Sequence, residues 1–73
     1  MTTPSTATFV FDTTTAALWA EEVARDAGIA AEVVPAPAAS DAKCDLALLT
    51  RADAAAALTE ALAGQGVPFR RWD

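Results

Sequence analysis

The order of strand-forming and helix-forming segments along the chain is the feature that most narrows its fold. Residues 6–11, 29–34, 45–50 and 67–72 are rich in β-branched, aromatic or other large apolar side chains, which predicts four strands. Apolar side chains at helical spacing predict helices over 14–27 and 51–63. The resulting order, β-α-β-β-α-β, is typical of a ferredoxin-like α+β sandwich. We therefore predict an antiparallel four-stranded sheet with two helices on one face.

Capping and strand-ending residues mark the boundaries of these segments. Asp12 and the threonines at 13–15 have side chains that accept hydrogen bonds from free helix N–H groups, so they predict the start of the first helix. Pro35 and Pro37 predict the end of the second strand, because proline cannot donate to a strand ladder. Residues 50–53, Thr-Arg-Ala-Asp, have the spacing of a capping box, which predicts the start of the second helix.

The size of the hydrophobic core is limited by alanine. Residues 1–73 are expected to form a single domain with a flexible N-terminus at 1–5, and alanine accounts for 20 of its 39 hydrophobic residues. A chain of this length buries only about 60% of its unfolded surface. Two-residue alternation around Phe9 and Leu48 places apolar side chains on both faces of the sheet. We expect the helix-free face to dock a partner protein or to form a homodimer with a second copy.

Composition excludes several classes of function. Histidine is absent, which removes histidine-based catalysis and histidine metal ligands. The net charge of −5 disfavours nucleic acid as a partner. No apolar run approaches the roughly 20 residues that span a bilayer, and the N-terminus lacks the positive region of a signal peptide. We therefore expect a cytoplasmic protein with no membrane partner, and one that is not a stand-alone enzyme.

The single cysteine, Cys44, is the only strong nucleophile in the sequence. In the predicted topology it lies where a loop enters the third strand, at the same sheet edge as the start of the first helix. Free helix N–H groups, threonine hydroxyls and Lys43 would stabilise a thiolate there, whereas Asp12, Asp41 and Asp45 would oppose it. A small buried core cysteine remains the structural alternative. The candidate site comprises Cys44, with Lys43, Thr13, Thr14, Thr15, Pro35 and Pro37.

Neither a metal nor another cofactor is expected at this candidate site. Asp41, Cys44 and Asp45 are the nearest potential ligands, and with one thiolate and no histidine they lack the ligand set of a structural zinc site. One cysteine also cannot form an internal disulfide, so the thiol is expected to be reduced.

Four short motifs occur in order along the chain. They are the helix-entry segment FDTTTAALWAE at 11–21, the Gly-Ile pair at 28–29, the Pro-Ala-Pro at 35–37, and a cysteine seven residues after the second proline. In this ordered set of motifs the sequence resembles a family of short bacterial selenium/sulfur carrier-like proteins. This chain departs from the family pattern at Ala38, where arginine is usual, and at Asp45, where glycine is usual.

The resemblance implies that Cys44 holds sulfur or selenium as a persulfide and passes it to a partner enzyme. A lone cysteine suits this task because no neighbouring thiol can resolve the persulfide into a disulfide. The alternative is a non-catalytic adaptor or small-ligand-binding module that docks on a larger enzyme, with the cysteine structural.

Overall fold

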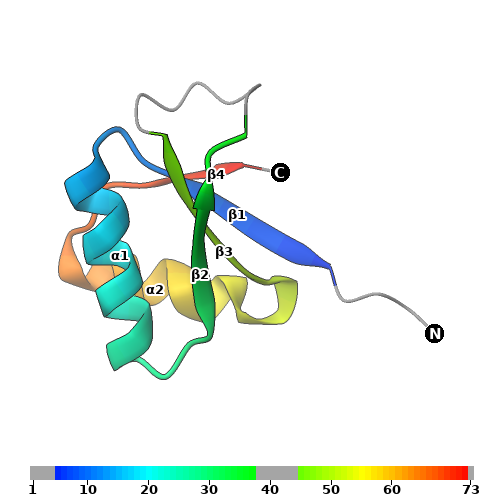
Figure 1. The fold of residues 1–73 in the computed structure, drawn as a ribbon. Coiled ribbons are helices and arrows are strands. Elements are labelled where there is room, and N and C mark those ends of the chain that lie inside the picture. The colour runs from blue at the N-terminus through cyan, green and yellow to red at the C-terminus, as the bar shows by residue number, and fades with distance from the viewer. Residues whose placement is uncertain (1–4, 38–44, 73) are drawn as a thin grey trace.

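A computed structural model of the chain describes residues 5–37 and 45–72 (Figure 1). The strands and helices follow the predicted β-α-β-β-α-β order, with one short 3₁₀ turn before the second helix. In sequence they are β1 (Thr6–Val10), α1 (Thr14–Asp26), β2 (Ala31–Pro35), β3 (Leu46–Arg51), the 3₁₀ turn (Ala52–Ala54), α2 (Ala55–Gln65) and β4 (Arg70–Trp72).

The strands form a four-stranded sheet in the order β2-β3-β1-β4, in which every neighbouring pair is antiparallel. Phe9 in β1 lies opposite Leu48 in the central strand β3, and Leu48 in turn lies opposite Val33 in the edge strand β2. Both helices lie on one side of this sheet (Figure 1). The prediction of a ferredoxin-like α+β sandwich is confirmed.

The core between the sheet and the helices contains few large side chains. From α1 it receives mainly alanine methyl groups, at positions 16, 17, 20 and 24. Larger groups come from the strands and from α2. Among the described residues the largest fully buried side chains are Phe9, Phe11, Leu48, Leu58 and Leu62. The thin core expected from the alanine content is therefore present, and each of these larger side chains carries a large share of the buried apolar area.

Helical spacing over 14–27 predicts that Ala16, Ala20, Val23 and Ala27 share one buried face of the first helix. Ala16, Ala20 and Val23 are buried, but Ala27 follows the last helical residue and is exposed. The buried face also includes Ala17 and Ala24, which leaves Trp19 at its border with 41% of the residue exposed.

The predicted capping box at the second helix is wrong. Thr50 is a buried residue of β3, and its hydroxyl donates a hydrogen bond of 2.8 Å to the backbone oxygen of Ala30. The chain therefore stays extended through Arg51, and Asp53 forms a surface ion pair with Arg51. The 3₁₀ turn has no side-chain cap, and α2 begins at Ala55.

The helix-free face of the sheet carries apolar side chains from every strand, as predicted. Strand pairing aligns two rows across this face, and each row includes one charged residue. The first row is Val34, Ala47, Val10 and Arg70, and the second is Glu32, Leu49, Thr8 and Trp72. Val10 and Ala47 are buried, whereas Trp72 at the outer strand is 38% exposed.

Two glycines near the end of α2 provide a matched test of its boundary. Gly64 lies inside the helix, and Gly66 ends it with a left-handed φ of 76°. A Cβ at either position would meet no atom within 4 Å, so only backbone conformation distinguishes the two sites. We expect Gly64→Ala to raise the free energy of unfolding by about 0.5–1 kcal/mol and Gly66→Ala to lower it by about 1 kcal/mol. Urea unfolding measures both, and shifts of equal sign would contradict this helix boundary.

Candidate functional site

The turn from β1 into α1, the end of β2 and the start of β3 lie together where these strands end, on one side of the sheet. We call this region the rim. Val10, the last residue of β1, lies beside Ala47, and Pro35 at the end of β2 lies opposite Leu46 at the start of β3. The start of α1 lies toward the same end of the molecule as the end of β2 and the start of β3 in Figure 1.

The threonines at the rim begin α1, as predicted. Thr13 is the N-cap residue, with extended backbone angles, and its side-chain oxygen accepts a hydrogen bond of 3.1 Å from the N–H of Ala16. Its backbone oxygen accepts a second bond of 3.2 Å from Ala17. Thr14 and Thr15 occupy the first helical turn with exposed side chains. The hydroxyl oxygen of Thr13 therefore serves the helix itself, and the hydroxyls at 14 and 15 lie at the surface.

The prolines lie where β2 leaves the sheet. Pro35 is the last residue of β2 and is exposed, while Pro37 is half-buried. Between them, the N–H of Ala36 donates a hydrogen bond of 2.8 Å to the backbone oxygen of Asp45. Pairing between the two chain segments thus continues one residue beyond β2 and fixes both ends of the connection at the rim.

Lys43 and Cys44, the centre of the predicted site, lie outside the described residues. Their predicted roles therefore remain predictions, as does the contribution of Asp41. The structure describes the residues that flank this segment in the sequence, namely Pro37 before it and Asp45 after it.

Sequence reasoning missed one charged residue at the rim. Arg70 in β4 donates a hydrogen bond of 2.9 Å to the carboxylate of Asp12, and the two side chains are 50% and 58% exposed. Asp12 and Arg70 are 58 positions apart in the sequence, so only the placement of β4 beside β1 could have revealed this pair. Because it is solvent-exposed it contributes at most about 1 kcal/mol. It places a cation beside Asp12, which weakens the repulsion that this carboxylate would exert on an anion at the rim.

The described residues offer no metal centre and no membrane-spanning helix. Within residues 5–37 and 45–72, no three potential Cys, Asp or Glu ligands come together. In the same part of the chain, neither helix has the length and apolar character needed to cross a bilayer.

The fold and the rim define a small α+β domain in which the β1–α1 turn, the end of β2 and the start of β3 lie at the same end of the sheet. A family model described as "Putative Se/S carrier protein-like" matches residues 6–72, so the chain belongs to that family. The match includes the helix entry, both prolines and the cysteine on which the resemblance was based. The family description is that of a carrier, not of an enzyme. No curated protein and no solved structure matched the chain.

The N-cap at the rim can be tested by removing its hydroxyl. Thr13→Ala is expected to lower the free energy of unfolding by about 1 kcal/mol, because the N–H of Ala16 loses its partner. Thr13→Ser keeps the acceptor and should retain most of the stability. Thr15→Ala, at an exposed helical position, is the matched control and should cause no loss. Equal destabilisation by Thr13→Ala and Thr15→Ala, measured by urea unfolding, would contradict the cap.

Proposed function

We propose that the protein is a sulfur or selenium carrier that holds the chalcogen on Cys44 and passes it between partner enzymes. The main support is the family match over residues 6–72, which contain a single cysteine. Cys44 is followed in sequence by Asp45, whose backbone is hydrogen-bonded at the rim. The protein would have no turnover of its own, in keeping with the carrier description of its family.

The transfer requires only thiolate chemistry. The Cys44 thiolate attacks the outer sulfur of a persulfide on a donor protein, and the S–S bond of the donor breaks as a new S–S bond forms on Cys44. The donor cysteine leaves as a thiolate, so one neutral sulfur atom moves and no external oxidant or reductant is consumed. The same exchange with an acceptor thiolate releases the sulfur. Selenium would move by the same exchange.

The rim offers suitable surroundings for this exchange. The N-terminal turn of α1 presents backbone N–H groups, which favour a nearby anion such as a thiolate or persulfide. Arg70 pairs with Asp12 at the same edge and weakens its repulsion of an anion. The prolines and the Ala36–Asp45 hydrogen bond restrict the ends of the connection that contains Cys44 and Lys43. In this proposal Lys43 contributes positive charge next to the thiol.

The second candidate is an adaptor in which Cys44 is structural. The exposed Trp72 on the helix-free face favours it, together with the half-buried Val34 and Leu49. In an adaptor this face would dock on a larger enzyme or pair with a second copy of the chain. The adaptor needs no reactive thiol, so the state of Cys44 distinguishes the two candidates.

Mass spectrometry tests the carrier directly. After incubation with a cysteine desulfurase and cysteine, the wild-type protein should gain about 32 Da, the mass of one sulfur atom. Cys44→Ser removes the only thiol, so it should gain nothing, and dithiothreitol should remove the added mass from the wild type. An unmodified wild-type mass, or equal labelling of Cys44→Ser, would end the proposal.

The reactivity of the thiol supplies an independent measurement. A carrier is expected to react with iodoacetamide at neutral pH about as fast when folded as in urea, whereas a structural cysteine is protected by the fold. Slow reaction of the folded protein, with no added sulfur, would favour the adaptor.

A further inference from the structure

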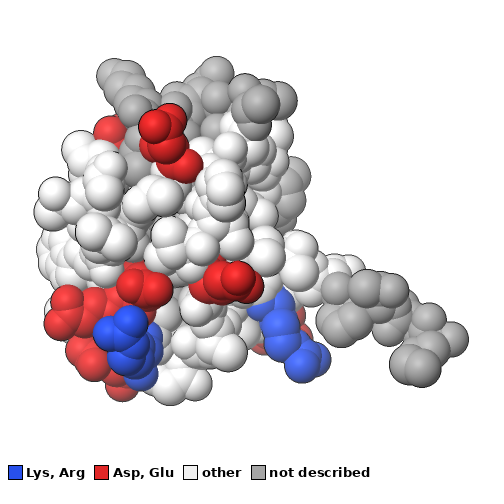
Figure 2. Space-filling view, in the orientation of Figure 1, with Lys and Arg blue, Asp and Glu red and all other residues white. Residues whose placement is uncertain are grey.

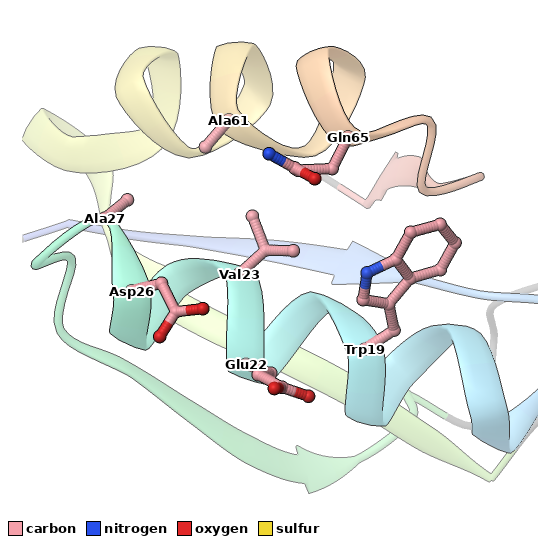
Figure 3. A pocket seen from close by; sticks show the side chains of 7 residues that line it. All are labelled: Trp19, Glu22, Val23, Asp26, Ala27, Ala61 and Gln65. Carbon is pink, nitrogen blue, oxygen red and sulfur yellow. The ribbon is translucent and has the colours of Figure 1, made fainter.

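A groove between the two helices lies outside the rim. It has a volume of about 350 Å³ and is bordered on the α1 side by Trp19, Glu22 and Asp26. Figure 3 shows these side chains along α1, with Ala61 and Gln65 of α2 on the opposite side. The volume lies at the lower end of the range for ligand pockets, about 300–1,000 Å³, which suits a single side chain or a small molecule.

The charges of α1 oppose the stability of the helix on its own. Its first turn contains no acidic residue, and its carboxylates lie in the second half, toward the negative end of the helix dipole, where Arg25 is the one basic residue of the helix. Glu22 and Asp26 are four residues apart, a spacing at which like charges repel. Within residues 5–37 and 45–72 neither forms an ion pair, whereas their neighbour Glu21 pairs with Arg25 at 3.6 Å. Two unfavourable charges thus border the same groove.

The carboxylates of α1 lie together at the surface of its last turns. Figure 2 shows acidic side chains gathered around a basic one at the lower left, where the last turns of α1 lie in Figure 1. A cation in the groove would relieve the repulsion between Glu22 and Asp26 and compensate the end of the helix dipole.

The remaining lining groups restrict what kind of cation fits. Val23 and Ala61 provide apolar surface between the helices, which suits the methylene stem of a long side chain. Trp19 offers an exposed aromatic ring, on which a planar guanidinium stacks better than a compact ammonium. Gln65 offers an amide that can hydrogen-bond to a peptide backbone.

We propose that this groove binds an arginine side chain presented by a segment of a partner protein. The guanidinium lies against Trp19 on the side of Glu22, with Asp26 one turn further along α1, and its stem packs on Val23 and Ala61. A second copy of the chain fits poorly, because each copy carries a net charge of −5. The groove is lined by residues of the two helices and by none of the described rim residues, so it serves as a docking point whether or not the carrier function holds.

An NMR titration of the full chain tests the groove. The probe is a short peptide of alternating arginine and glycine, and the readout is the indole N–H signal of each of the two tryptophans. Trp72→Phe assigns the signals. The Trp19 signal should shift and saturate, while that of Trp72, on the helix-free face, should stay in place. The same peptide with citrulline in place of arginine keeps the shape without the charge and should not bind.

Two double variants distinguish binding of the peptide in the groove from its general electrostatic attraction to an acidic protein. Glu22→Gln combined with Asp26→Asn should lower the affinity for the arginine peptide about tenfold, because two partly exposed charge contacts are lost. This variant should also melt about 2–4 °C higher, which shows that it is folded. Glu32→Gln with Glu60→Gln removes the same charge outside the groove and should bind nearly as tightly as wild type.

Three results would overturn the proposal. They are equal weakening by both double variants, equal shifts of both tryptophan signals, and binding of the citrulline peptide as tight as that of the arginine peptide. Because the titration does not involve the thiol, Cys44→Ser should bind the peptide as wild type does. Failure of the groove is therefore distinguishable from failure of the carrier.

Discussion

The packing around Phe9 is the interaction on which the rest of the structure depends. Phe9 is fully buried in the central strand β1, opposite Leu48 of β3. Its ring lies 5.5 Å from that of Phe69, in a tilted arrangement, and the guanidinium of Arg71 lies 5.1 Å from its centre. One side chain thus joins the middle of the sheet to the segment that becomes β4.

The abundance of alanine shapes the surface as well as the core. Methyl groups on α1 fill the space above the sheet, so the larger side chains that remain come from β1, β3 and α2. On the outer side of the helices, Ala27 and Ala61 face the gap between α1 and α2 without filling it. The composition that gives a thin core therefore also leaves the groove beside Trp19 open.

The sequence was most informative where structure is determined locally. The threonines before α1 and the prolines at the end of β2 each act through their own backbone or nearest neighbours, and the boundaries they predicted were close to those observed. Long-range contacts were missed. Thr50 was assigned to a cap because its partner, the carbonyl of Ala30, lies 20 residues away, and the Asp12–Arg70 pair depends on strands that meet only in the sheet. Cys44 and Lys43 lie outside the described residues, so that part of the site stays a prediction.

The outer strand β4 is short, and this has a consequence for how the sheet opens. Strand β1 forms five residue pairs with β3 but only three with β4, whose side chains are all exposed. Backbone N–H groups alternate in direction along a strand. Those of β1 that point to β4 therefore face the strand that is paired over fewer residues. Their protons should exchange with deuterium sooner than those directed toward β3. Protection along this single strand should therefore alternate from residue to residue, with detachment of β4 as the lowest-energy opening of the domain.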